Sequence, residues 1–297
     1  MGGARAVMDT GHRGRSVRAL VVTGTLRVAT WNVNSIRARV QRVVDWLARA
    51  EIDVLAMQET KCSDTQFPAM PFLAAGYEVA HCGYDQWNGV AIASRVGLAD
   101  VQHDFEGQPT WSRDGSATRS EARALGATCA GIRVWSLYVP NGRSLDDPHY
   151  RYKLQWLAAL RDTAHSWLQH DPQAPIALTG DWNVAPTDED VWDVDFFRDS
   201  THVSEPERAA FDAIETGFPD VVRPFTPGPG VYTYWDYTQL RFAKRQGMRI
   251  DHILASPALA RRVRNAEIVR DERKGGKTRI GSPSDHAPVL IDVDPAH

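Results

Sequence analysis

The feature that most limits what this chain can fold into is a set of apolar segments, each of which carries a polar side chain of a kind found in catalytic or metal-binding sites. Five of them read as strands: "LRVATWNV" (26–33), "DVLAMQET" (53–60), "RVWSLYVP" (133–140), "PIALTGDWN" (175–183) and "RIDHILAS" (249–256). The polar residues that mark their ends are Asn32, Glu59, Tyr138, Asp181 with Asn183, and Asp251. Taken singly, such residues are often turn or capping residues. Their repetition after strand upon strand predicts one site on a common rim, because rigid strands hold functional groups in place.

The rest of the chain predicts a mixed, layered α+β domain. "GVAIAS" (89–94) and "PVLIDV" (288–293) are further strands, and "SDHAP" places Asp285 and His286 just before the last one. Apolar residues at helical spacing predict a helix after Ile36 and a longer one over about 150–169. Because strands and helices do not alternate regularly, a parallel doubly wound fold is not favoured. We expect a single catalytic domain over residues 26–294, preceded by a disordered basic tail or an over-called start at 1–25.

The donor set at the predicted rim indicates metal-assisted hydrolysis of a phosphoester. Oxygen ligands without sulfur, namely those of Asn32, Glu59, Asp181 and Asp285, suit Mg²⁺, with Mn²⁺ as a substitute. Asp181 and Asn183 are two apart and face the same side of an extended segment, where they can orient water and stabilise phosphoryl charge. Asp251 could hold His286 as an imidazolium against a phosphate oxygen, since a buried carboxylate raises the pKa of histidine.

Composition excludes several classes of protein. A hydrophobic content of 43% and a charged content of 24% are typical of globular chains, and no apolar run is long enough to cross a membrane. The three cysteines show no zinc spacing, which predicts reduced thiols in a cytoplasmic protein. The net charge of −3 hides a basic segment, 241–279, with twelve Lys and Arg. That segment could meet phosphates, although it could equally be a solvated face.

Seven ordered motifs resemble the exonuclease III branch of the endonuclease/exonuclease/phosphatase superfamily. They cover about 26–293 and read "TWNVNSIRAR", "LAMQETK", "NGVAIAS", "LYVPNGR", "TGDWNVAP", "MRIDHIL" and "SDHAPV". The resemblance implies a four-layered α/β sandwich, with two mixed sheets packed face to face and helices outside. It also implies a DNA-repair nuclease of base-excision repair that cuts 5′ to abasic sites in double-stranded DNA. Associated 3′-to-5′ exonuclease, 3′-phosphatase or phosphodiesterase activity is expected, in a monomer that binds no membrane.

The resemblance also implies a role for each residue of the predicted site. Asn32, Glu59 and Asp285 would bind the metal, in a set that extends to Asp181 and Asn183. Asp181 would activate the attacking water, Asn183 would stabilise the transition state, and Tyr138 would contact the scissile phosphate. His286, oriented by Asp251, would hold the same phosphate. Arg143 would enter the DNA duplex. The resemblance does not fix the balance between abasic-site incision and exonuclease action, nor the number of metal ions.

The aromatic stretch "YTYWDY" (232–237) bears on the substrate. In an extended segment Tyr232, Tyr234 and Asp236 face one side while Thr233, Trp235 and Tyr237 face the other, so half of it is expected in the core. The resemblance assigns an abasic-sugar pocket to Tyr234, Met248 and Ile250, and adds Trp235 to the lesion-binding set. Relatives often carry Trp where this chain has the smaller Tyr234, which bears on lesion selectivity.

Three other functions remain open at this point. An inositol-phosphate phosphatase or a sphingomyelinase-like enzyme would share the metal centre but not "YTYWDY" followed by "MRID". A catalytically inactive nucleic-acid-binding module would have lost a residue such as Asp181 or His286, and both are present. A secreted nuclease would be expected to carry a signal peptide and a disulfide pair.

Overall fold

The structure, a computed structural model, describes residues 24–112, 116, 119–275 and 281–295. Most of the predicted N-terminal tail therefore lies outside the described residues, as do 276–280 of the basic segment. Within the described part of the chain, no helix is long and apolar enough to span a membrane.

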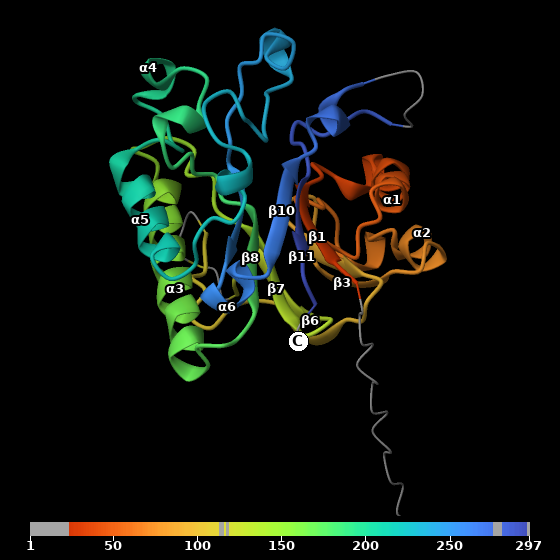
Figure 1. The fold of residues 1–297 in the computed structure, drawn as a ribbon. Coiled ribbons are helices and arrows are strands. Elements are labelled where there is room, and N and C mark those ends of the chain that lie inside the picture. The colour runs from red at the N-terminus through yellow and green to blue at the C-terminus, as the bar shows by residue number, and fades with distance from the viewer. Residues whose placement is uncertain (1–23, 113–115, 117–118, 276–280, 296–297) are drawn as a thin grey trace, which may run out of the picture.

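Two mixed β-sheets form the centre of the molecule (Figure 1). One has six strands in the order β10-β11-β1-β2-β4-β3, and the other has five in the order β5-β6-β7-β8-β9. Their bounds are β1 Leu26–Asn32, β2 Val54–Gln58, β3 Glu78–Cys82, β4 Val90–Ser94, β5 Ala99–Gln102, β6 Ala124–Cys129, β7 Ile132–Tyr138, β8 Ile176–Asp181, β9 Asp251–Ala255, β10 Val263–Ile268 and β11 Val289–Val293. The pairs β1–β2 and β7–β8 are parallel, and the remaining neighbours are antiparallel.

Helices cover the outer face of each sheet (Figure 1). The helices of the described residues are α1 Val40–Arg49, α2 Ala69–Ala74, α3 Pro148–His170, α4 Val194–Phe197, α5 Glu205–Glu215 and α6 Pro257–Ala260. The helix α1 with α2 lies outside the six-stranded sheet, and α3 with α5 lies outside the other. The helix predicted over 150–169 begins earlier because Asp147 caps it through the backbone N–H of His149. The order helix, sheet, sheet, helix confirms the predicted four-layered sandwich.

Alternation along the strands explains why the two sheets pack face to face. In β1, Val28 faces the other sheet while the neighbouring Ala29 faces the helical layer. In β8, Ala177 and Leu178 alternate in the same way. Both faces of these strands are therefore buried, which is why they read as nearly continuous apolar runs rather than as half-polar strands. Burying both faces also makes the strand ends rigid.

The segment "YTYWDY" is not a strand, contrary to the expectation of an extended run. It makes only isolated bridges, in which Tyr234 pairs with Met248 and with His286. Thr233 nevertheless points inward as predicted, and its hydroxyl accepts from the backbone N–H groups of Ile250 and Asp251, each at 3.1 Å. Tyr237, by contrast, is 49% exposed although it was predicted to share the buried side. The chain turns into the short 3-10 helix η5 (Thr238–Leu240), which ends the alternation.

Candidate active site

The polar strand ends converge because of how the strands pair. Since β1 and β2 are parallel, Asn32 at the end of β1 lies beside Glu59, which directly follows β2. In the other sheet β7 and β8 are parallel, and Tyr138 is registered with Asp181 at their ends. The carboxyl ends of parallel neighbours meet at the same edge of a sheet, and the two sheets bring their edges together.

Asp251 reaches the same edge by a different route from the one predicted, whereas Asp285 and His286 reach it, as predicted, from just before the last strand. Asp251 does not end a strand but begins β9, where it is registered with Asp181 of the antiparallel β8. Asp285 and His286 likewise precede β11, which runs antiparallel to β1. The start of an antiparallel strand lies beside the end of its partner, so both routes deliver side chains to one rim.

A pocket of about 180 Å³ lies at this rim. Nine of the predicted residues line it, together with two that were not predicted: Glu59, Tyr138, Asp181, Asn183, Tyr234, Met248, Ile250, Asp285 and His286, with Asn141 and His202. Asn32 and Asp251 are fully buried beneath it, at 0% and 1% exposure. The pocket therefore combines acidic, cationic and apolar walls in a small space.

Asp181 and His286 form the charged centre of the pocket. His286 Nε2 lies 3.8 Å from an Asp181 oxygen, and His286 Nδ1 bonds Asp251 at 2.8 Å. Burial alone would lower the pKa of His286, but the Asp251 carboxylate and then Asp181 raise it to about 10. Burial raises the pKa of Asp181 to about 7, with His286 opposing and Asp251 adding to the rise. At neutral pH the site thus holds an imidazolium beside a carboxylate able to accept a proton.

Asn32 and Lys61 hold the Glu59 carboxylate beside this charged centre. The amide nitrogen of Asn32 donates to Glu59 Oε1 at 2.8 Å and to Asp181 at 2.9 Å. Lys61 lies 2.7 Å from the other Glu59 oxygen. Burial would raise the pKa of Glu59, but the Lys61 ammonium lowers it below its usual range. Burial and then the Glu59 charge raise the pKa of Tyr138 well above its usual range, so its hydroxyl stays protonated.

The chemistry of this donor set fits a divalent cation. Glu59, Asp181 and His286 each offer a ligand atom within 4.8 Å of the others. His286 is held as a cation by Asp251, so the oxygen donors are the better ligands. The carboxylates of Glu59, Asp181, Asp251 and Asp285 line or underlie the pocket, where Lys61 pairs with Glu59 and His286 pairs with Asp251. A divalent ion would balance that excess of negative charge. The Asn32 amide is oriented with its nitrogen toward the carboxylates, so it links them rather than presenting its oxygen.

Asn183 is positioned by groups that sequence reasoning missed. Its side-chain oxygen accepts from Asn141 at 3.1 Å and meets His202 Nε2 at 3.0 Å, while its nitrogen donates to Val139. Burial, and then the nearby Lys153, lower the pKa of His202 to about 4, so this imidazole is neutral. Lys153 itself is fully buried and bonds the Asn183 carbonyl and Glu207. The amide predicted to face developing phosphoryl charge is thus held from three sides.

Apolar walls close one side of the pocket, largely as predicted. Met248 and Ile250 are buried, at 7% and 2% exposure, and the Tyr234 ring packs against His286 with centroids 4.9 Å apart. Trp235 does not belong to this wall. It is 1% exposed and packs with Tyr232 and Ala287, because its side chain points from the loop into the protein. The assignment of Trp235 to lesion binding is therefore wrong.

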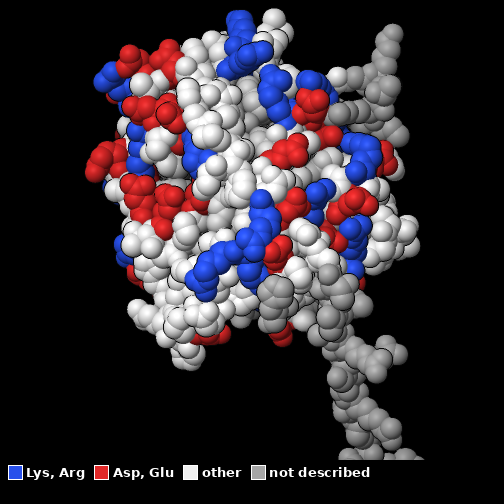
Figure 2. Space-filling model, in the orientation of Figure 1, with Lys and Arg blue, Asp and Glu red and all other residues white. Residues whose placement is uncertain are grey.

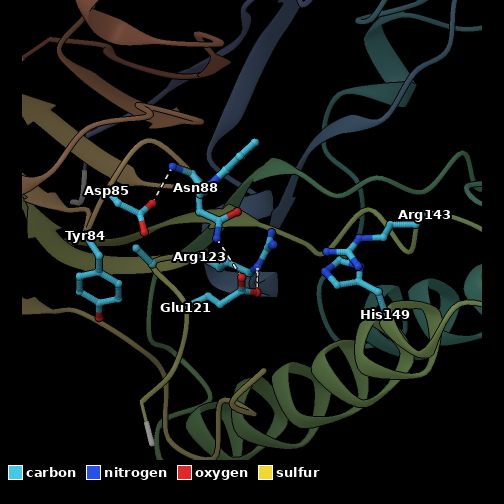
Figure 3. Close-up of a pocket in the computed structure, with 9 residues that line it drawn as sticks. Tyr84, Asp85, Asn88, Glu121, Arg123, Arg143 and His149 are labelled. Atoms are coloured by element: carbon cyan, nitrogen blue, oxygen red, sulfur yellow. Dashed lines mark hydrogen bonds and ion pairs between the residues drawn. The ribbon is translucent and has the colours of Figure 1, made fainter. Parts of the chain in front are cut away.

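Arg143 lies outside the catalytic pocket, in a neighbouring cavity of about 380 Å³ (Figure 3). Arg143 and His149 lie on one side of that cavity, while Asn88, Glu121 and Arg123 lie in its middle. Trp87, which is 66% exposed, also lines it. Arg143 is half-exposed and pairs only loosely with Asp147, at 3.8 Å. The structure thus places Arg143 at the surface beside the catalytic pocket, and its entry into DNA stays a prediction.

His149 makes the stability of this region dependent on pH. It is 4% exposed and accepts from the backbone N–H of Gly142 at 3.2 Å. Burial, and then Arg123, lower its pKa to about 4 from an ordinary 6.5. Between these two values the unfolded chain binds more protons than the folded one, so stability falls as the pH falls. We expect this residue alone to cost about 2 kcal/mol of unfolding free energy between pH 7.5 and 5.

Urea unfolding at the two pH values, with His149→Gln beside the original chain, measures that cost. Glutamine keeps an acceptor for Gly142 but does not titrate, so the variant should lose about 2 kcal/mol less on acidification. His170→Gln, at the exposed end of α3, is the matched control and should leave the pH dependence unchanged. Equal acid sensitivity of the original chain and His149→Gln would show that His149 is not buried as a neutral base.

Several functional residues could have been found from local signals, but others could not. Asn34 and Lys61 lie in the quoted motifs "TWNVNS" and "QETK", and their side chains bond each other at 2.6 Å. Asn34 also donates to Asp285 at 3.0 Å, so this pair ties the two predicted metal ligands together. Asn141 lies in "VPNG". No local pattern marks His202, which reaches the pocket from a loop before α5.

Charge is distributed unevenly over the face shown in Figure 2. Acidic side chains gather over α4 and α5, whereas Lys and Arg gather near the η5 loop and over the front of β10. The Lys and Arg near the η5 loop and β10 belong to the basic segment 241–279. A polyanion approaching the pocket would meet the basic η5 loop beside Tyr234.

Known proteins resemble this chain along most of its length. Residues 29–286 match the endonuclease/exonuclease/phosphatase family. The chain is 29% identical over 276 residues to exodeoxyribonuclease III of Haemophilus influenzae, which covers 90% of this chain and 99% of that protein. A solved AP endonuclease from Archaeoglobus fulgidus is 37% identical with a TM-score of 0.80, covering 91% of this chain and 99% of its own. A Neisseria 3′ phosphatase bound to product DNA hairpin is 34% identical with a TM-score of 0.82, and also covers 91% and 99%.

Proposed function

Because the chain belongs to the endonuclease/exonuclease/phosphatase family and is a hydrolytic nuclease of the exonuclease III type, we propose that it cuts DNA 5′ to abasic sites and also acts at 3′ ends. The observation that carries the proposal is Asp181, a buried carboxylate with a pKa near 7, set between His286 and Glu59. Relatives with the names AP endonuclease and 3′ phosphatase support the two substrates.

Glu59 and Asp285 would hold Mg²⁺, or Mn²⁺ in its place, beside the phosphate. When bound, such an ion stabilises charge on the phosphoryl oxygens and on the leaving oxygen. Asn32 and Lys61 keep the Glu59 carboxylate turned toward the pocket. The Asp285 carboxylate is turned by Asn34 at 3.0 Å.

Hydrolysis then follows from the protein groups around the phosphorus. Asp181 accepts a proton from a water, whose oxygen forms a new bond to phosphorus as the bond to the 3′ oxygen breaks. The imidazolium of His286 and the Tyr138 hydroxyl donate hydrogen bonds to phosphate oxygens, where negative charge builds up. Asn183, held by Asn141 and His202, presents its amide to the same charge. The leaving 3′ oxygen takes up a proton from solvent, so the products are a 3′ hydroxyl and a 5′ phosphate.

Selection of the lesion is proposed to rest on the apolar walls. A sugar without a base can enter the 180 Å³ pocket against Tyr234, Met248 and Ile250, whereas a stacked and paired nucleotide resists extrusion from the duplex. Most other contacts would go to backbone phosphates, which position DNA without reading its sequence.

One chain suffices for the proposed reaction. Every group assigned to it comes from one copy, so we propose a monomer on double-stranded DNA. We propose a cytoplasmic location because Cys62, Cys82 and Cys129 are free and buried, which suits a reducing compartment.

Two labelled duplexes test the function directly. One carries a single internal tetrahydrofuran as an abasic analogue, and the other carries a recessed 3′ end. With Mg²⁺ we expect incision 5′ to the analogue and shortening of the recessed end, and chelation by EDTA should stop both. An undamaged blunt duplex of the same sequence measures background cutting.

Product analysis and a non-DNA substrate separate the alternatives. The incised strand should end in a hydroxyl that a polymerase can extend. Hydrolysis of an inositol phosphate or of sphingomyelin, with both duplexes left intact, would contradict the proposal. Shortening of the recessed end without incision at the analogue would restrict it to the exonuclease part.

A further inference from the structure

A second cavity adjoins the catalytic pocket. It measures about 280 Å³ and shares Tyr234 and Met248 with the pocket, so these two side chains separate the spaces. Its far side is formed by Trp192 and by Phe196 and Phe197 of α4. No residue of the proposed catalytic machinery other than the shared wall lines it. The cavity is thus distinct from the catalytic centre but lies directly beside it, across the wall formed by Tyr234 and Met248.

The far wall is a cluster of rings, and one of them is exposed. Trp192 and Phe196 have centroids 5.2 Å apart, and Phe196 and Phe197 lie 4.9 Å apart edge to face. The Arg241 guanidinium lies over the Trp192 and Phe196 rings, at 5.1 and 4.8 Å. Phe196 is nevertheless 54% exposed. An exposed phenyl ring held beside a guanidinium is the arrangement on which nucleobases stack.

The sizes of the two spaces indicate what each can take. The catalytic pocket, at about 180 Å³, is smaller than the roughly 300–1,000 Å³ of ordinary small-molecule sites. It suits a phosphate and a sugar, whereas a nucleotide that keeps its base needs further room. The two cavities together fall within the ordinary range. An abasic residue would need only the first cavity, and a nucleotide with a base would need both.

We propose that the second cavity holds the nucleobase of a terminal nucleotide while that nucleotide is removed from a 3′ end. The inference rests on the proposed function, and it assigns the second cavity to the removal of nucleotides from 3′ ends. The base stacks on Phe196 and Arg241, with Tyr234 at the entrance. Stacking on a ring tolerates every base, since each has a π face, so removal should show little sequence preference.

Removal of a 3′-terminal residue that carries a base, compared with removal of one that lacks it, tests the inference. Two recessed duplexes differ only in the last 3′ residue, which is deoxyadenosine in one and tetrahydrofuran in the other. Phe196→Ala should slow single-turnover removal of deoxyadenosine roughly tenfold, because stacking on one ring is lost. Removal of the terminal tetrahydrofuran, and incision at an internal one, should stay within twofold. Phe196→Tyr keeps a stacking ring and should restore the rate.

A control variant and a thermal melt distinguish the loss of base stacking from a loss of folding. Phe225→Ala removes a ring that is 42% exposed and does not line the cavity, so it should change neither rate. Since Phe196 is more than half exposed, Phe196→Ala should keep the melting temperature of the original chain, which a thermal melt checks.

Three results would overturn the inference. Equal slowing of both ends by Phe196→Ala would make Phe196 a general DNA contact, and no slowing of either would leave the cavity without a role. An original chain that removes only base-free residues would show that no base is accommodated, while the abasic-site function would stand. An original chain that cleaves neither end nor the internal analogue contradicts the proposed function itself.

Discussion

Asp181→Asn is expected to lower kcat by roughly 10³- to 10⁴-fold on either duplex while the chain remains folded. The variant keeps the shape of the side chain but cannot accept the proton of the attacking water. Asp181 is 2% exposed and has a pKa near 7, raised by burial and by the neighbouring Asp251 and Glu59 carboxylates. Removing one negative charge from this cluster relieves repulsion, so the melting temperature should be unchanged or higher.

Quenched-flow cleavage of the abasic duplex and a thermal melt measure the two effects. Binding of uncleaved DNA by Asp181→Asn should be no weaker than that of the original chain, which separates catalysis from recognition. Asp162→Asn, an exposed carboxylate of α3 with its side chain 69% accessible, is the matched control and should retain full activity. Asp181 would lose its role as the base if its asparagine variant turned over at more than a tenth of the original rate.

Arg249→Met is expected to lower the unfolding free energy by about 3–5 kcal/mol. Arg249, from the "MRID" motif, is 3% exposed and is not a DNA contact. It donates to Asp190 at 2.6 Å and also to Asp220, and both carboxylates are buried. Burial would raise the pKa of Asp190, but Arg249 holds it below its usual range. Without the guanidinium, two buried carboxylates lose a charged partner, and the remaining Arg223 beside Asp190 and His252 beside Asp220 offset only part of their desolvation.

Urea unfolding of Arg249→Met and of a charge-balanced variant tests the origin of the loss. Replacing Asp190 and Asp220 by Asn in the Arg249→Met background should recover part of the stability, because the stranded charges are gone. Arg245→Met, an exposed position on the preceding loop, should cost less than about 0.5 kcal/mol. A loss below 1 kcal/mol in Arg249→Met would show that the two carboxylates are solvated rather than buried.

Much of the fold follows from local patterns. The strands ending at Asn32, Tyr138 and Asp181 lie where apolar runs place them, since burial on both faces leaves a strong signal. The long helix over 148–170 follows from its apolar face. The stretch "YTYWDY" departs from the extended run that its sequence predicts. Here the rings pack from a loop, tied down by Thr233, and no neighbouring strand pairs with it.

The site was predictable in its chemistry but not in all its members. Glu59, Asp181 and Asn183 stand out because polar groups follow apolar runs there, and His286 stands out because it lies just before the last apolar run. Trp235 could not be told from Tyr234 by composition, and only the direction of its side chain assigns it to the core. His202 carries no local signal, although it contacts Asn183.

The sequence by itself determined seven of the strands, the polar residues beside them and the kind of reaction those residues support, but it did not predict β3, β5, β6 and β10. Only the tertiary structure decided that Arg249 is a buried partner of Asp190 and Asp220, and that α4 and the η5 loop enclose a second cavity beside Tyr234. The physical reason is how far apart in the sequence the interacting residues lie. The pattern of apolar and polar residues along a strand indicates which side chains are buried, and this pattern depends on residues only a few positions apart. Contacts such as that of Arg249 with Asp190, 59 residues apart, depend on which strands pair and how their loops pack.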